Sequence, residues 1–205
     1  MAYYHISSGM FSSGVVLGNG DGMELNSGGS AGSTTVNFGG TMTVFNGGAA
    51  TSTTVNAGGI MAVSGGSATS TTVNTGGGMT VFSGGTATST TVKTGGVMTV
   101  SSGGTTGSIR LDRGAQVELA SGARVEFELT GLQPDGNFLI NNYTLVIDHG
   151  ATYTITIGAD QAAGTYLLVS NAATFTNSIS LTVNGIDHGR LASGQSVTDR
   201  KTGVS

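Results

Sequence analysis

Residues that could perform acid–base or metal chemistry are few and scattered in this chain. His149 and His188 lie in two copies of the tetrapeptide IDHG, at 147–150 and 186–189. An aspartate beside a histidine could orient an imidazole or join a metal site, but Asp-His-Gly between strands is also favourable turn chemistry. We interpret both copies as turns. We interpret His5, which is alone among aromatic residues, as a packing residue.

The carboxylates form no catalytic pattern. The only local group contains Glu118, Glu126 and Glu128, and the last two flank Phe127, so alternation places them on a solvated strand face. No acidic residue occurs from 28 to 104, so the repeated aspartates of a calcium-binding β-roll are missing. The chain has no cysteine and therefore no thiolate site. We predict no catalytic residue, no metal site, no cofactor and no enzymatic activity.

Hydroxyl side chains, in contrast, recur at fixed intervals. Ser33, Ser52, Ser70 and Ser89 are separated by 19, 18 and 19 residues, and Ser108 continues the series. If the nearby valines point into a core, alternation along a strand points the first four of these serines outward. The series therefore predicts a ladder of exposed hydroxyls.

The elements that carry this ladder follow from the composition. The 205 residues include 37 glycines, one proline and no tryptophan; 9% are charged, and the net charge is -4. Low charge with much Gly and Ser is typical of disordered linkers, but the 37% hydrophobic residues are placed periodically, which argues against disorder. Seven basic residues in an acidic chain exclude electrostatic binding to nucleic acid. No apolar run is long enough to insert into a bilayer, and the N-terminus does not have the pattern of a signal peptide.

Glycine pairs set the period of the repeat. Successive pairs, from Gly28 to Gly103, alternate between steps of 11 and of 7 or 8 residues, which gives a period of 19 with one coil of 18. Three apolar series keep this period: Met23, Met42, Met61, Met79 and Met98; Leu25, Val44, Val63, Val81 and Val100; and Val36, Val55, Val73 and Val92, continued by Ile109.

This repeat predicts an all-β fold, a right-handed parallel β-solenoid with one 19-residue coil per layer. Met and Val two residues apart share one strand face, and glycine permits positive φ at the corners. A helix is disfavoured, because each interior glycine costs about 1 kcal/mol relative to alanine. We divide the chain into an N-terminal cap or irregular first coil (1–22), the repeat solenoid (23–104) and a wider β-solenoid continuation with a C-terminal cap (105–205).

The C-terminal region contains longer strand candidates, at 142–147, 152–157, 165–170 and 178–183. Their alternation with turn residues fits antiparallel strands or wider solenoid strands. The last residues, RLASGQSVTDRKTGVS, look like the cut end of a longer chain and are expected to be disordered.

Alternation also predicts the outer surface of the repeats. Phe45 and Phe82 should face outward and form a contact surface, unless a loop covers them. The asparagines Asn37, Asn56 and Asn74 form a ladder that either points outward or turns inward at a corner, where stacked amides hydrogen-bond one another. We interpret Lys93, in the last regular coil, as the end of this ladder and as a solvated charge that discourages further coils from joining.

The repeats resemble those of AIDA-type adhesins, the passenger regions of self-associating autotransporters. The resemblance rests on paired glycines, TTVN and GGxMTV, which recur in order through 20–104. The opening YYHISSGMFSSGVVLGNGDGMEL is similar to the N-terminal openings of large repeat adhesins, and YTITIGADQAAGTYLLVSNAATF is more loosely similar to modules that follow such repeats.

The resemblance implies a secreted or bacterial surface-exposed module that functions in adhesion, autoaggregation and biofilm formation. Its expected partners are further copies of itself or a surface receptor. Family members are O-glycosylated with heptose on repeat Ser or Thr by a dedicated glycosyltransferase, and the matching positions here are Ser33, Ser52, Ser70, Ser89 and Ser108.

A ligand-binding face is the alternative. The triplet TST recurs at 51–53, 69–71 and 88–90, and flat Thr-x-Thr arrays on solenoids can bind ice or glycans. The alternation that buries Val55 turns Thr51 and Thr53 inward, although a corner between them would expose such an array.

Overall fold

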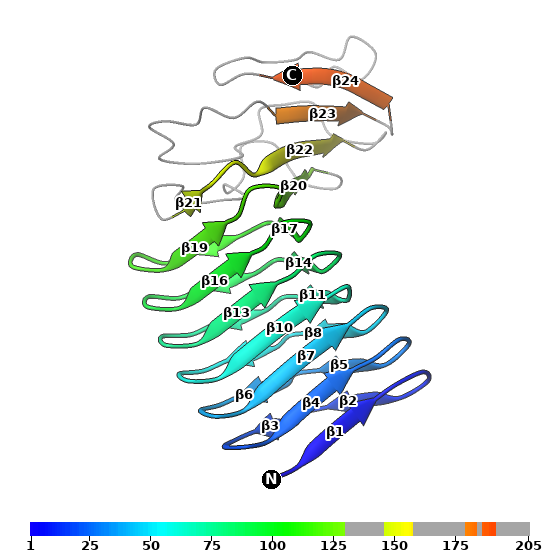
Figure 1. Ribbon diagram of the computed structural model, residues 1–205, viewed down its shortest axis with the longest axis vertical. Helices are drawn as coiled ribbons and strands as arrows, with labels where there is room; N and C mark the ends of the chain where they lie inside the picture. Colours follow the sequence, from blue (N-terminus) through cyan, green and yellow to red (C-terminus); the bar gives the residue numbers. More distant parts are fainter. Residues whose placement is uncertain (130–145, 158–178, 184–185, 192–205) are drawn as a thin grey trace.

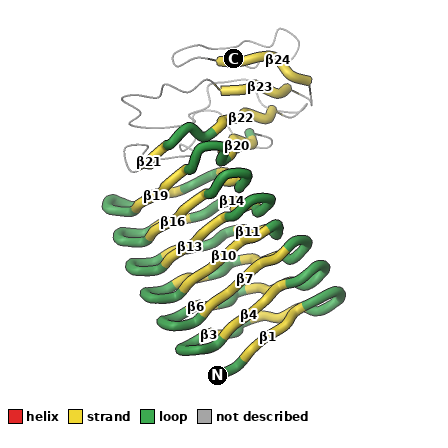
Figure 2. Tube along the Cα trace, in the orientation of Figure 1, coloured by secondary structure: helices red, strands yellow, loops and turns green. Residues whose placement is uncertain are grey.

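The computed structural model describes residues 1–129, 146–157, 179–183 and 186–191. Among these residues there are strands and turns but no helix (Figure 2). The chain winds upward in stacked coils (Figure 1), and each of the first six coils contributes one short strand to each of three sheets. The predicted parallel β-solenoid is confirmed.

We call the three sheets A, B and C. Sheet A contains β1 (Tyr3–Ile6), β4 (Gly22–Leu25), β7 (Thr41–Phe45), β10 (Ile60–Ser64), β13 (Gly78–Val81), β16 (Val97–Val100), β19 (Gln116–Leu119) and β21 (Val146–Asp148). Sheet B contains β2 (Phe11–Ser13), β5 (Ser30–Gly32), β8 (Ala49–Thr51), β11 (Ser67–Thr69), β14 (Thr86–Thr88), β17 (Thr105–Gly107), β20 (Arg124–Glu128), β22 (Thr152–Ile157), β23 (Ile179–Val183) and β24 (Ile186–Leu191). Sheet C contains β3 (Val16–Leu17), β6 (Thr35–Val36), β9 (Thr54–Val55), β12 (Thr72–Val73), β15 (Thr91–Val92) and β18 (Arg110–Leu111).

The register places equivalent residues on top of one another. Met61 pairs with Met42 on one side and Met79 on the other, and its side chain is fully buried. Sheet B lines the core with alanines in the central coils, and sheet C lines it with valines. The valine series continues at Leu111, the register partner of Val92. The predicted continuation at Ile109 is therefore wrong by two positions, because Ile109 is buried one period after Thr90.

Each glycine pair combines two different constraints. At the pair Gly76–Gly77, Gly76 has a φ of 71°, a conformation that side chains with a Cβ rarely adopt. A Cβ on Gly77 would lie 2.6 Å from the carbonyl oxygen of Val55 in the preceding coil. The first glycine thus makes the turn, and the second lets one coil pack closely on the next.

The regular stacking extends beyond the expected repeat at both ends. We expected a cap or an irregular coil over residues 1–22, yet β1, β2 and β3 pair in parallel register with the strands of the next coil. Beyond Gly104, β17, β18, β19 and β20 continue the same three sheets. Larger core side chains fill these later coils, including Phe127 and Tyr153, whose rings stack with centroids 6.2 Å apart.

The C-terminal strand predictions have mixed outcomes. β22 matches the predicted strand at 152–157, and β23 falls within 178–183. The candidate at 165–170 and most of 142–147 lie outside the described residues, as does the predicted tail except for Arg190 and Leu191, which belong to β24. β23 and β24 form the only antiparallel strand pair within the described ranges.

Candidate modification and contact surfaces

The serine ladder lies at the corner between sheets B and C. Ser33, Ser52, Ser70, Ser89 and Ser108 are the non-glycine residues with positive φ in the described chain, with φ between 52° and 57°. The first four are exposed and Ser108 is half-buried. The backbone N–H of Ser52 donates to the carbonyl oxygen of Thr69 in the next coil at 2.9 Å, which holds the corner in place. The predicted outward orientation of the first four serines is confirmed.

The left-handed serine also resets the alternation of the strand. In one coil Thr51 and Ser52 are exposed while Thr53 is buried. The prediction that Thr51 turns inward is therefore wrong, because the corner at Ser52 interrupts the alternation. Thr51, Thr69 and Thr88 form one exposed row, but their Thr-x-Thr partners are buried in the core. The flat two-column array that an ice-binding face requires is not formed.

The asparagine ladder runs along the corner that follows sheet C. Asn56 Nδ2 donates to Asn37 Oδ1 at 2.8 Å, and Asn74 Nδ2 donates to Asn56 Oδ1 at 2.7 Å. All three side chains are half-buried. The stacked-amide interpretation is confirmed.

Lys93 stands above Asn74 and ends the amide ladder, as predicted, but the prediction that it discourages further coils from joining is wrong. A further coil stacks on it, and Lys93 Nζ forms an ion pair with Asp112 Oδ2 of that coil at 3.2 Å. The residue thus joins one coil to the next by an ion pair where the earlier coils use amide hydrogen bonds.

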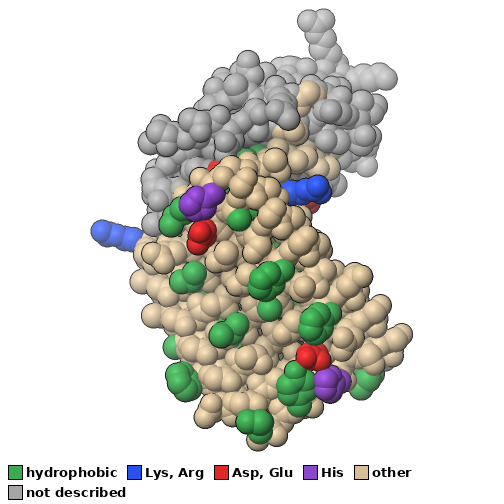
Figure 3. All heavy atoms as spheres, viewed as in Figure 1, with side chains coloured by type: hydrophobic (Ala, Val, Ile, Leu, Met, Phe, Trp, Pro, Cys, Tyr) green, Lys and Arg blue, Asp and Glu red, His purple; other side chains and the backbone are tan. Residues whose placement is uncertain are grey.

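The outer face of sheet A carries the exposed apolar residues of the central coils. Phe45 and Phe82 are 37% and 44% exposed, and Ile60 and Val97 are 55% and 40% exposed. Figure 3, which looks onto this sheet, shows separate hydrophobic side chains between two pairs of a histidine and an acidic residue. The predicted outward orientation of both phenylalanines is confirmed, and their role in contacts stays a prediction.

The histidines take positions that differ from one another. His5 is exposed and pairs with Glu24, with 3.0 Å between Nδ1 and Oε2, so it is more than a packing residue. His149 pairs with Glu118 at 3.3 Å. The turn at the first IDHG is confirmed, because Asp148 Oδ1 accepts the N–H groups of Gly150 and Ala151.

The second IDHG, at 186–189, lies inside β24, so the turn interpretation is wrong there. Pairing of Ile186 and Asp187 with β23 places this copy in a strand, which the tetrapeptide alone does not reveal. Glu126 is exposed, as predicted.

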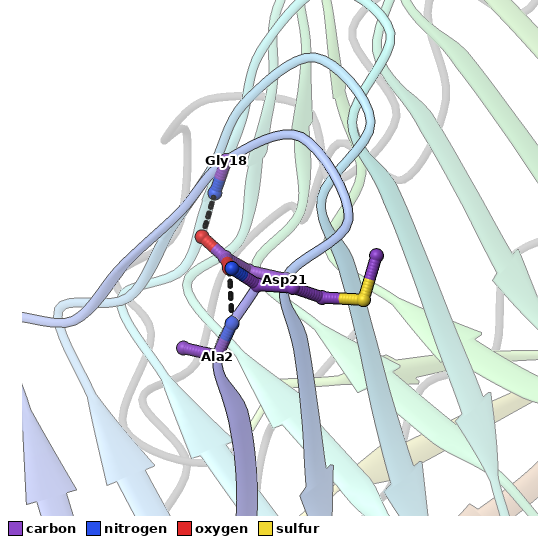
Figure 4. Close-up of polar contacts among 4 residues, drawn as sticks. Ala2, Gly18 and Asp21 are labelled. Carbon is purple, nitrogen blue, oxygen red and sulfur yellow. Dashed lines mark hydrogen bonds and ion pairs between the residues drawn. The ribbon is translucent and has the colours of Figure 1, made fainter.

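Asp21 fastens the N-terminal coil. Its carboxylate accepts hydrogen bonds from the backbone N–H groups of Ala2 and Gly18 (Figure 4). These bonds, that of Ala2 first, lower the pKa of Asp21 below its usual value, because they stabilise the charged form. The side chain was not singled out from the sequence, although its spacing of 19 residues from Ala2 equals the repeat period.

Neither a metal centre nor a helical membrane span emerges from the residues that the structure describes. No three of their His, Asp or Glu side chains gather as a metal site would require. None of the described segments is a helix with the length and hydropathy needed to cross a bilayer.

These surfaces on a three-sided stack of coils define a fibrous β-solenoid with repeated side-chain ladders. The family model described as "Adhesin of bacterial autotransporter system, probable stalk" matches residues 3–59 and 60–115, more than half of the chain. The chain belongs to this AIDA family of adhesins. It is a secreted or bacterial surface-exposed structural module.

One solved structure gives a more specific likeness. It is described as "Crystal structure of TibC-catalyzed hyper-glycosylated TibA55-350 fragment", with 35% sequence identity and a TM-score of 0.53. The match covers 79% of this chain and 60% of that one, so our chain spans less than two thirds of that fragment. Comparison with curated protein sequences gives no match.

Proposed function

We propose that this chain is a non-enzymatic part of an adhesin stalk that functions in adhesion, autoaggregation and biofilm formation. Two observations support the proposal: the match to the adhesin stalk family, and the stack of similar coils. Stacked repeats of this kind extend along one axis and present long ladders of side chains. Such ladders suit repeated weak contacts with a receptor or with another copy of the protein.

We further propose that Ser33, Ser52, Ser70, Ser89 and Ser108 are O-glycosylated, with heptose, by a glycosyltransferase that acts on the repeats. The observation that carries this proposal is the shared backbone conformation of the five serines. Four of these corner serines are exposed, and Ser108 is half-buried. An enzyme could therefore reach each serine without opening the coil. The similar TibA fragment is hyper-glycosylated, which supports the proposal.

Intact mass of the protein purified from its native host tests the modification. A mass above that of the bare polypeptide is expected, with peptide mapping that assigns sugar to the serine corner. Replacing all five serines with glycine should abolish it, because glycine keeps the positive φ and removes only the hydroxyl. As a matched control, Thr51→Val, Thr69→Val and Thr88→Val change the adjacent exposed hydroxyls and should leave the mass shift intact. An unmodified native protein would contradict the proposal.

Self-association is the second part of the proposed function, and we propose that Phe45 and Phe82 contribute to it. Both rings are exposed on one sheet face of a secreted or surface-exposed protein, where an apolar surface favours contact. Sedimentation of the chain over a range of concentrations should show association. The double variant Phe45→Ser with Phe82→Ser should weaken it strongly. Unchanged association in that variant would rule out the aromatic contact.

A further inference from the structure

Large and small side chains alternate on the outer face of sheet A. Four consecutive strands, β7, β10, β13 and β16, with the residues Phe82 and Ser101 that directly follow β13 and β16, present three columns of outward residues in register. The first column contains Thr41, Ile60, Gly78 and Val97; the middle column contains Thr43, Ala62, Thr80 and Thr99; the third column contains Phe45, Ser64, Phe82 and Ser101. In the outer columns each strand carries one large and one small residue, and the order reverses from each strand to the next.

The result is a checkerboard of knobs and holes. Phe45 and Phe82 project in the third column, with Ser64 between them; Ile60 and Val97 project in the first column, with Gly78 between them. The hole at Gly78 is open, since a Cβ added there would meet no atom within 4 Å.

We propose that this face pairs with the same face of a second copy of the chain, in antiparallel orientation, by inserting knobs into holes. The inference rests on the proposed self-association and specifies its geometry. The two-fold axis runs parallel to the strands, between β10 and β13, so the two solenoids run in opposite directions. It places β7 against the partner's β16 and β10 against the partner's β13, and each column faces the same column of the partner. Phe82 then faces the partner's Ser64, and Ile60 faces the partner's Gly78. Each large residue of the four strands meets a small one, as close packing requires.

The middle column selects the antiparallel orientation. A two-fold axis along the solenoid would instead make the two copies run in the same direction and set each strand against its own copy. The outer columns would still pair large residues with small ones, but Ala62 would face the partner's Ala62 and leave a gap at the centre. The antiparallel axis sets Ala62 against Thr80 of the second copy. The same axis is the midpoint of the eight-stranded sheet, so β1 meets β21 and β4 meets β19.

The size of the face is compatible with a weak pairing of this kind. Eight strands about 4.8 Å apart and about four residues long cover about 500 Å² per copy, or about 1,000 Å² in total, which is the lower limit of a specific interface. Among the described residues of this face, the charged groups are Glu24 and Glu118, each already paired with a histidine. The axis that sets β4 against β19 also places Glu24 opposite the partner's Glu118, so like charges meet at the two ends and weaken the contact there. A face of this size should give a weak contact that many copies on a surface strengthen through avidity.

Filling a hole provides the decisive test. Ser64→Phe adds an exposed ring, so a merely sticky patch would associate more tightly. The checkerboard predicts the opposite: sedimentation equilibrium of the chain should show self-association weakened by about tenfold or more, because two rings then collide. Gly78→Leu fills the other hole and should act in the same way. Far-UV circular dichroism and the unfolding temperature check that each variant folds.

Exchanging a knob with a hole tests the orientation. The double variant Ser64→Phe with Phe82→Ser restores a ring opposite a serine only in the antiparallel dimer, so association should return to within about threefold of the original. The chain has no cysteine, so single thiols can be placed freely. A short bismaleimide should join Thr43→Cys to Thr99→Cys in a mixture, and should not join Thr43→Cys to itself.

The outcomes separate this inference from the proposed function. If the unchanged chain does not associate at all, the proposed self-association fails, and the pairing fails with it. If the chain associates through Phe45 and Phe82 but Ser64→Phe strengthens the contact, self-association stands and the checkerboard is wrong. Crosslinking of Thr43→Cys to itself would overturn the antiparallel orientation.

Discussion

The inner and outer faces of sheet A obey different rules. The inner face repeats the same side chains, with methionine in every strand from β4 to β16 and valine or leucine two residues later. The outer face changes from strand to strand, as the sequence of Thr41, Ile60 and Gly78 shows. Each inner side chain must fit the coils above and below, so one solution repeats. The outer positions meet no such constraint within the chain and are free to carry recognition.

The largest expected effect distinguishes the two faces of a single strand. Met61→Ala should lower the free energy of unfolding by about 2–5 kcal/mol, because it leaves a cavity in a fully packed column. Ile60→Ala, at the adjacent exposed position, should change it by no more than about 0.5 kcal/mol. Denaturant unfolding of the two variants measures the difference. Equal losses would show that the outer face also stabilises the monomer.

Two adjacent glycines should differ in the same way. Gly77→Ala places a methyl group 2.6 Å from the carbonyl oxygen of Val55 and should cost about 1–3 kcal/mol. Gly78→Ala points outward into open space and should be neutral or slightly stabilising, since alanine restricts the unfolded chain. The unfolding temperatures of both variants provide the measurement. A loss at Gly78 as large as that at Gly77 would contradict the assignment of their roles.

The asparagine ladder should have an intermediate effect. Asn56→Ala removes both amide hydrogen bonds of the ladder and should cost about 1–2 kcal/mol, because its half-buried neighbours each lose a partner. Asn37→Ala removes one of these bonds and should cost about half as much. Comparable losses in the two variants, measured by chemical denaturation, would argue against additive ladder bonds.

The smallest expected effect concerns Lys93. Lys93→Asn replaces an exposed ion pair with an amide above Asn74, and the unfolding free energy should change by no more than about 1 kcal/mol. The contribution of the pair with Asp112 should shrink as salt is added, whereas an amide contact should not respond. Unfolding at low and high ionic strength separates the two, and a salt-independent difference would exclude the ion pair as its cause.

Local patterns were sufficient to predict the fold. Three signals predict the strands and corners: the glycine pairs, the 19-residue period, and the Met and Val series. They suffice because the conformation of each strand or corner depends on its own residues and on the equivalent residues of the adjacent coils. The outward phenylalanines follow from alternation along β7 and its continuation in later coils. The pair of Lys93 with Asp112 was also within reach, since the two residues are separated by one period.

Tertiary structure decided the features that interrupt a local rule. Serine is not a residue that ordinarily adopts positive φ, so nothing in TST showed that Ser52 turns a corner and exposes Thr51. The tetrapeptide IDHG bends after Asp148 in the first copy but lies wholly within β24 in the second, because pairing with β19 ends at Asp148 whereas β24 runs along β23 as far as Leu191. The checkerboard on sheet A likewise depends on residues from four coils. The sequence determines which side chains leave the core, but the register of the stacked coils decides which of them become neighbours.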